Sequence, residues 1–133
     1  MLEKDFALEL SSALKSEGFY STRLESRYTE TGIPDMYVMG LDTFLELKCV
    51  GKTTQECLKS TYYRPDWRPG QLAWSRRYTL ANKKAMYTVV RCTDGVLLLP
   101  STRAEPLGVP VEDIVVLQNC TEAVQLLKVV CAK

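Results

Sequence analysis

Histidine is absent from this chain of 133 residues. The absence excludes, within this chain, catalysis by an imidazole general base, including serine–histidine and cysteine–histidine arrangements, and zinc sites that contain histidine. Any hydrolytic chemistry must therefore depend on carboxylates, lysine and a bound metal ion.

Long apolar runs and paired cysteines are also missing. No apolar stretch reaches about 18 residues, so no membrane span is expected. Residues 1–5 lack the pattern of a signal peptide. The five cysteines form no Cys-x-x-Cys pair and most lie in apolar runs, which favours reduced thiols. We therefore expect a cytoplasmic protein without a membrane partner.

The composition is that of one globular domain spanning residues 1–133. Apolar residues make up 46% and charged residues 25% of the chain, which are ordinary globular values. The net charge is only +1, but residues 48–84 carry nine basic and two acidic side chains. This basic block is either a solvated face or a surface that contacts phosphates.

Two short stretches carry the strongest chemical signal: Gly32-Ile33-Pro34-Asp35, and then Phe44 to Lys48. Residues 43–50 are predicted to form a strand, so Glu46 and Lys48 point to the same face. Asp35 opens a second predicted strand, residues 36–39, and residues 40–42 can reverse the chain. If the two strands pair as a hairpin, Asp35 and Glu46 converge at one end of the sheet.

Two neighbouring carboxylates repel each other unless a cation lies between them. Their hard oxygens suit Mg²⁺ or Mn²⁺, and a lysine beside the metal can orient a water or stabilise developing negative charge. Asp35, Glu46 and Lys48 are thus typical of metal-assisted phosphodiester hydrolysis. The alternative is an ordinary strand with a solvent-facing glutamate–lysine pair.

Helical periodicity predicts a first helix over residues 2–17, whose apolar stripe comprises Leu2, Phe6, Leu10, Ala13 and Leu14. Glu3 falls near the centre of this stripe, where a carboxylate is costly unless it is paired or metal-linked. Otherwise Glu3 is an exposed acid that stabilises the helix start.

A second helix is predicted over residues 69–81, with Gln71 in its first turn, where free backbone amides favour anions. Further strands are predicted at residues 19–28, 85–92, 96–99 and 112–117. A final apolar helix, residues 121–131, covers the sheet or forms a partner surface.

The segment 51–68 is predicted to be irregular. Gly51-Lys52-Thr53 fails as a phosphate-binding loop, because Glu46 stands where that motif requires glycine. Aromatic residues interleave with basic ones, which suits stacking on bases or packing on the chain's own domain. The aromatic residues are Tyr62, Tyr63 and Trp67.

The order helix, strand, G-I-P-D, F-L-E-L-K, helix with glutamine, strand resembles the PD-(D/E)XK nuclease superfamily over residues 1–99. The likeness is greatest to its VRR-NUC and archaeal Holliday-junction-resolvase branches, in which an x-P/G-x-Q stretch like Arg68-Pro69-Gly70-Gln71 opens the second helix. The resemblance implies an α/β fold, a restriction-endonuclease-like mixed β-sheet flanked by α-helices. Residues 100–133 would be a C-terminal extension of that core.

The resemblance also implies roles for single residues. Asp35, Glu46 and the Leu47 carbonyl would bind Mg²⁺ or Mn²⁺, and Lys48 would position or activate the attacking water. Gln71 would orient Lys48 or the scissile phosphate, and Glu3 would complete the outer metal shell. The basic residues expected to contact DNA are Lys52, Lys59, Arg64, Arg68, Arg76 and Arg77.

We therefore predict a metal-dependent deoxyribonuclease, structure-selective for branched DNA such as a Holliday junction. Because a junction is two-fold symmetric, two symmetric cuts call for a homodimer, with the C-terminal helix as candidate interface. The alternatives are a general or end-directed DNA nuclease of repair or packaging, a catalytically silent DNA-binding module, and an RNA-processing nuclease. Compact members of the superfamily are common in bacteriophages, so phage origin in a host cytoplasm is a further expectation.

Overall fold

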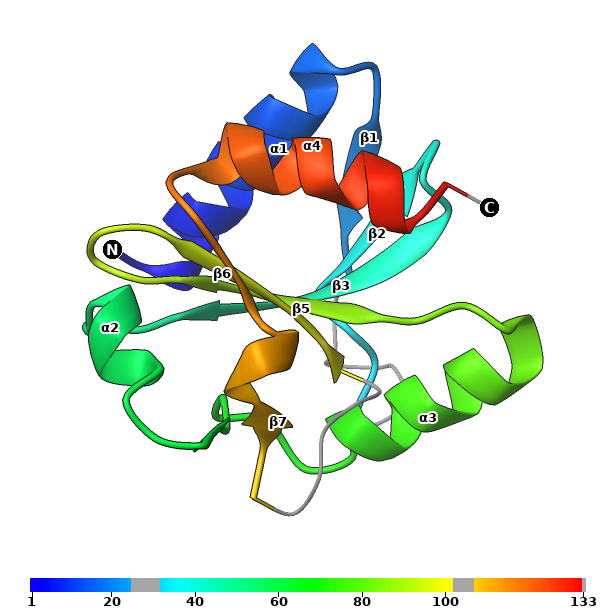
Figure 1. The fold of residues 1–133 in the computed structure, drawn as a ribbon. Coiled ribbons are helices and arrows are strands. Elements are labelled where there is room, and N and C mark those ends of the chain that lie inside the picture. Colours follow the sequence, from blue (N-terminus) through cyan, green and yellow to red (C-terminus); the bar gives the residue numbers. More distant parts are fainter. Residues whose placement is uncertain (25–31, 102–106, 133) are drawn as a thin grey trace.

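The computed structural model describes residues 1–24, 32–101 and 107–132. A six-stranded sheet has the order β1-β2-β3-β5-β6-β8 (Figure 1). The strands are β1 (Tyr20–Arg23), β2 (Met36–Met39), β3 (Thr43–Cys49), β5 (Tyr87–Arg91), β6 (Val96–Pro100) and β8 (Val115–Leu117). Only β3 and β5 pair in parallel, so the sheet is mixed.

The remaining elements flank this sheet. The helices are α1 (Glu3–Ser16), α2 (Thr54–Cys57), α3 (Gln71–Asn82) and α4 (Cys120–Val130), and η2 (Val111–Asp113) is a 3₁₀ turn. A second, two-stranded ribbon joins β4 (Tyr62–Tyr63) to β7 (Val109–Pro110). The predicted mixed α/β sheet flanked by helices is confirmed.

Helices α1 and α4 lie side by side over one face of the sheet (Figure 1). Phe6, Leu10 and Leu14 of α1 are fully buried there, together with Leu127 of α4. Each such side chain contributes roughly 1.5–3 kcal/mol by leaving water. The prediction that Leu2 joins this stripe is wrong: it precedes the helix and is 62% exposed.

The opposite face is covered by α2, the segment that follows it, the start of α3 and the β4–β7 ribbon. A second apolar cluster there includes Trp67, Leu97 and Leu99. Trp67 is buried, and its indole N–H donates to Thr88 Oγ1 at 3.0 Å. The idea that Trp67 stacks on bases is therefore wrong, and the alternative of packing within the domain is confirmed for this residue.

The short elements differ most from the sequence prediction. The segment 51–68, expected to be irregular, contains α2 and β4, and α2 begins with a capping box between Thr53 and Glu56. The predicted strand 112–117 is a 3₁₀ turn followed by β8. The predicted strand 19–28 is observed as β1, and residues 25–28 lie outside the described ranges. Within those ranges, no helix is both long and apolar enough to cross a membrane.

Candidate active site

Strand β3 supplies two of the expected site residues. Leu45 and Leu47 point into the core under α1, so the alternating side chains of Glu46 and Lys48 share the opposite face. Lys48 Nζ lies 3.4 Å from Glu46 Oε2, and the two side chains are 12% and 4% exposed. The predicted common orientation of this pair is confirmed.

Asp35 reaches the same place from the start of β2. The β2–β3 ladder ends where Met36 faces Leu45, so β2 does not pair with Leu47. Asp35 takes over that role, because its Oδ2 accepts the Leu47 amide proton at 3.0 Å in a buried hydrogen bond. The N–H and C=O of one strand residue point to the same side of the strand. The Leu47 carbonyl is therefore also directed toward Asp35, where β2 no longer pairs with β3.

Gln71, the first residue of α3, connects Glu46 of β3 to the segment before α3. Its Nε2 donates to Glu46 Oε2 at 2.6 Å, and its Oε1 accepts from the Arg68 amide at 2.6 Å. Gln71 is itself buried. It thus fixes the carboxylate of Glu46 relative to the start of α3.

A close backbone approach brings the two loops of the site together. Gly32 has φ +92°, and a Cβ built on it would lie 2.3 Å from the Gly70 carbonyl oxygen. Only glycine accepts both this conformation and this contact without strain. The glycine of G-I-P-D therefore lets the loop before Asp35 pass against the residue before Gln71.

Arg68 occupies a position that the sequence did not indicate. Its Nη2 lies 3.4 Å from Asp35 Oδ1 and 3.5 Å from the Ile33 carbonyl oxygen. The sequence prediction placed Arg68 only among the DNA contacts. Its closeness to Gln71 in the chain was the available signal, but nothing local shows that the guanidinium turns back to Asp35.

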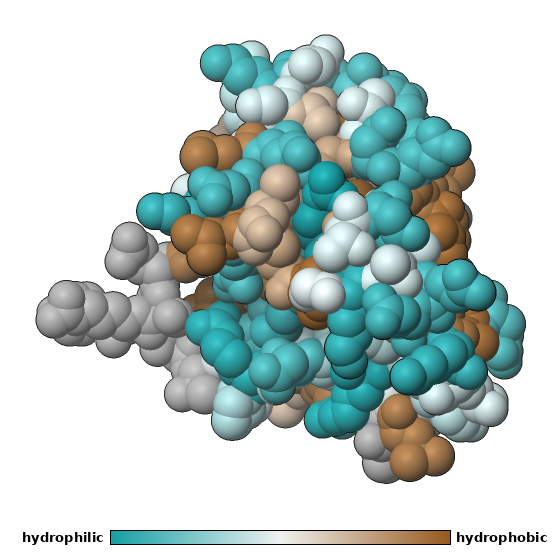
Figure 2. All heavy atoms as spheres, turned by 90° about the vertical axis from the view of Figure 1, so that its left-hand side faces the viewer, coloured by the Kyte–Doolittle hydropathy of each residue, from teal (hydrophilic) through white to brown (hydrophobic). Residues whose placement is uncertain are grey.

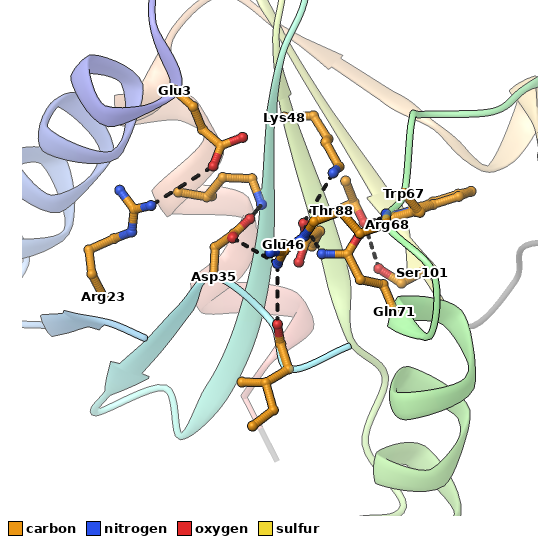
Figure 3. Close-up of polar contacts among 12 residues, drawn as sticks. Glu3, Arg23, Asp35, Glu46, Lys48, Trp67, Arg68, Gln71, Thr88 and Ser101 are labelled. Atoms are coloured by element: carbon orange, nitrogen blue, oxygen red, sulfur yellow. Dashed lines mark hydrogen bonds and ion pairs between the residues drawn. The ribbon is translucent and has the colours of Figure 1, made fainter. Parts of the chain in front are cut away.

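Glu3 approaches the site from the first turn of α1 (Figure 3). Its side chain is 41% exposed and pairs with Arg23 at 3.9 Å. Partial burial raises its pKa first, and the Asp35 charge raises it further, while Lys48 lowers it. Glu3 therefore belongs to the electrostatic surroundings of the two buried acids.

The charge of Glu46 is incompletely compensated. Burial, followed by the neighbouring Asp35, raises its pKa to about 8, although Lys48 and Gln71 act in the opposite direction. Its Oε1 is buried and has no hydrogen-bond partner among the described residues. Such an oxygen is costly to keep charged unless a cation or proton joins it.

A small cavity lies next to Glu46. Its lining includes Glu46, Gln71, Ser75 and Ser101. The Ser75 hydroxyl is likewise buried without a partner in the described part of the chain. Glu46 and Gln71 thus share this cavity with two hydroxyl groups, and the Ser101 hydroxyl is hydrogen-bonded to Thr88 at 2.7 Å.

The described residues contain no cluster of three cysteine, aspartate or glutamate side chains close enough to hold a metal. The donor set is instead two carboxylates, Asp35 and Glu46, with the Leu47 carbonyl. These are hard oxygens, which fit Mg²⁺ or Mn²⁺. The buried Glu46 Oε1, which has no hydrogen-bond partner within the described ranges, also suits a divalent ion, because the ion would compensate its negative charge.

Most of the basic residues expected at DNA lie outside this cluster and are exposed. Lys52 and Lys59 flank α2, and the Arg64 guanidinium lies 5.6 Å from the Trp67 ring centre. Arg76 and Arg77 lie on α3. Hydrophilic residues cover most of the described surface on the side that carries α2 and the N-terminus (Figure 2).

No protein-family model and no curated protein matches this chain. Among solved structures, it is similar to Hjc, a Holliday junction resolvase from the archaeal hyperthermophile Archaeoglobus fulgidus. The two share 13% identity and a TM-score of 0.56 over 91% of this chain and 98% of that chain. At this identity the likeness shows the fold alone, a mixed sheet flanked by helices as in that nuclease.

Proposed function

We propose that this chain is a metal-dependent endonuclease of the PD-(D/E)XK type that cuts branched DNA. The observation that carries the proposal is the convergence of Asp35, Glu46, Lys48 and Gln71 on one face of the sheet (Figure 3). The fold shared with a Holliday junction resolvase supports the choice of a branched substrate.

Asp35, Glu46 and the Leu47 carbonyl would hold the Mg²⁺ or Mn²⁺ ion. When bound, such an ion neutralises phosphate charge and lowers the pKa of a coordinated water. Lys48, mostly buried beside Glu46, would hold the attacking water or stabilise charge on the phosphate. Gln71 keeps Glu46 in place through its 2.6 Å hydrogen bond.

The exposed basic residues would grip the DNA backbone on either side of the cut. Lys52, Lys59 and Arg64 come from the segment before α3, and Arg76 and Arg77 come from α3 itself. Such contacts bind phosphates without reading sequence, which suits recognition of DNA shape. Two cuts in a symmetric junction would require a homodimer, for which α4 remains the candidate interface.

The test is a cleavage assay with Mg²⁺ or Mn²⁺ on linear, nicked, flapped and four-way DNA and on RNA. We expect paired symmetric cuts at four-way junctions, lost in Asp35→Asn, Glu46→Gln and Lys48→Ala while DNA binding persists. Glu112→Gln, a change at an exposed glutamate, is the matched control and should cut normally.

The other outcomes separate the alternatives. Equal cutting of linear DNA would replace the junction specificity with a general nuclease, and cutting of RNA would indicate RNA processing. Binding of junctions without cleavage in either metal would contradict the enzyme and favour a silent DNA-binding module. The mass of the chain in solution, free and with a junction, tests the homodimer.

A further inference from the structure

The contact between Arg68 and Asp35 lies at the centre of the proposed metal site. Asp35 Oδ2 accepts the Leu47 amide proton, so a cation meets less competition at Oδ1. The Arg68 guanidinium is the group found next to that oxygen, at 3.4 Å (Figure 3). A protein cation therefore occupies the place beside Asp35 that the proposed metal ion would take.

The Arg68 backbone is held firmly, whereas its side chain is held loosely. Its amide donates to Gln71 Oε1 at 2.6 Å, and its carbonyl accepts from the Gln71 amide at 3.1 Å. The guanidinium contacts at 3.4 and 3.5 Å are long for hydrogen bonds, and the side chain is 46% exposed. Asp35, by contrast, is 10% exposed in its side chain.

We infer that Arg68 couples metal capture to DNA binding: it pairs with Asp35 in the free protein and moves to a backbone phosphate of the DNA. This inference rests on the proposed function, because it concerns the same site. A guanidinium pairs bidentately with phosphate, and those charge-assisted bonds are stronger than the two long contacts it would leave. Its departure frees Asp35 Oδ1 for the divalent ion.

The coupling follows from the competition between two cations, Arg68 and the metal ion, for Asp35. In the free protein, Arg68 partly neutralises Asp35 next to Glu46, whose own charge is poorly compensated. A metal ion must then displace a cation in order to bind. By linkage, a phosphate that removes Arg68 must raise metal affinity, and the metal must raise DNA affinity by the same factor. The site therefore binds the ion more tightly when DNA is bound than in the free protein.

The test measures Mn²⁺ binding by calorimetry in the chain without DNA. Arg68→Gln should bind Mn²⁺ about five- to tenfold more tightly than the unchanged chain, the lower range of such couplings. Arg91→Gln removes an arginine that pairs with another acid, Glu9 of α1, at 3.1 Å, and it should leave Mn²⁺ affinity unchanged. A role of Arg68 in folding alone would not tighten metal binding.

The second measurement adds a four-way DNA junction in a Lys48→Ala background, which prevents the proposed cleavage. The junction should raise Mn²⁺ affinity when Arg68 is present and have much less effect in Arg68→Gln. If Arg68→Gln fails to fold, Arg68→Lys takes its place. It keeps the charge but loses bidentate pairing, so we expect near-normal Mn²⁺ affinity alone and weaker enhancement by DNA.

The outcomes distinguish this inference from the proposed function. If the unchanged chain binds Mn²⁺ through Asp35 and Arg68→Gln binds it equally or less tightly, Arg68 does not compete with the metal. Full enhancement by DNA in Arg68→Lys would likewise overturn the coupling. If Mn²⁺ affinity is the same in Asp35→Asn as in the unchanged chain, the proposed metal site itself is wrong.

Discussion

The two faces of the sheet differ in how many polar side chains are buried against them. Under α1 and α4, the buried side chains are almost all apolar, and Phe6, Leu10 and Leu127 are fully buried among them. The opposite face combines an apolar cluster around Trp67 with buried polar residues that approach one another. Those polar residues include Asp35, Glu46, Gln71, Ser75, Thr88 and Ser101.

Strand β3 shows what this difference teaches, because it contributes to both faces. Leu45 and Leu47 are buried in the apolar core, while Glu46 and Lys48 contact polar side chains on the other face. Burial of the first pair stabilises the strand enough to hold the second pair in an unfavourable environment. Stability and chemistry are therefore separable along a single strand, and mutations at adjacent positions can test this.

The largest expected effect is on activity, at Glu46. Glu46→Gln should lower junction cleavage at least a thousandfold, about 4 kcal/mol in activation free energy, because the metal loses a charged ligand. The folded state should keep or gain stability near pH 8, since a buried carboxylate with a raised pKa is removed. Single-turnover cleavage and urea unfolding measure the two effects. Retained cleavage would show that Glu46 holds no catalytic metal.

The neighbouring position should give the reverse pattern. Leu45→Ala removes a fully buried side chain from the opposite face and should lower the free energy of unfolding by about 2–5 kcal/mol. Cleavage per folded molecule should change little. The control is Val129→Ala on α4, whose side chain is 70% exposed, with an expected cost of about 0.5 kcal/mol or less. Equal costs for both variants would contradict the described core.

The third test concerns the pH dependence of stability without divalent ions. Glu46 has a pKa of about 8 in the folded chain against an ordinary 4.5, so the folded state binds its proton more tightly. Its contribution is complete below pH 4.5 and is lost as pH rises toward 8, at about 1.4 kcal/mol per pH unit.

Urea unfolding in EDTA between pH 5 and 7.5 measures this slope. Glu46→Gln should lack the Glu46 contribution, whereas the exposed Glu112→Gln should keep it. Equal slopes in the unchanged chain and Glu46→Gln would mean that Glu46 is not held in a raised-pKa environment. Added Mn²⁺ should restore stability at the upper end of this range, because it favours the charged form.

Two of the five described glycines with positive φ, Gly32 and Gly18, sharpen the comparison further. Gly32→Ala strains the backbone and meets the Gly70 carbonyl, so we expect a loss of about 1–3 kcal/mol and a larger loss of cleavage. Gly18→Ala has φ +85° but open space, so only the conformational cost, about 1 kcal/mol, should remain. Thermal unfolding and cleavage of both variants test this, and equal activity would argue that the Gly32–Gly70 contact does not set the site.

The sequence predicted the parts of the fold that depend on periodicity. The alternation of residues 43–50 placed Glu46 and Lys48 on one side, and β3 ends within one residue of its predicted limit. The short elements α2, β4 and β7 were not predictable in this way, although β2 was predicted with its observed bounds. Strand β4 exists because Tyr62 and Tyr63 pair with Val109 and Pro110, which are distant in the chain.

The site itself was only partly visible in the sequence. The acids, the lysine and the glutamine could be proposed from their spacing, but the partners that set their charges could not. Arg68 reaches Asp35 only through the fold, and so does Arg23, which pairs with Glu3 at 3.9 Å. The sequence left Trp67 open to either base stacking or packing within the domain, and only the fold shows its burial and its bond to Thr88 of β5.

The smallest expected effect contrasts one lysine from each side of the molecule. Lys59 is exposed after α2, on the side of the proposed DNA surface, whereas Lys128 of α4 pairs with Glu17 at 2.8 Å. Each lost phosphate contact reduces the slope of log affinity against log salt by about one. Lys59→Ala should therefore weaken junction binding modestly and flatten this slope, while Lys128→Ala should leave both unchanged.

Fluorescence anisotropy across a range of salt concentrations would resolve the difference. The unchanged chain should lose affinity steeply as salt rises, because several basic side chains release counterions from the DNA together. A change of slope in Lys128→Ala, with none in Lys59→Ala, would move the DNA to the α1–α4 face. The apolar and polar faces would then have exchanged their assigned roles, and α4 could no longer be the free interface of a dimer.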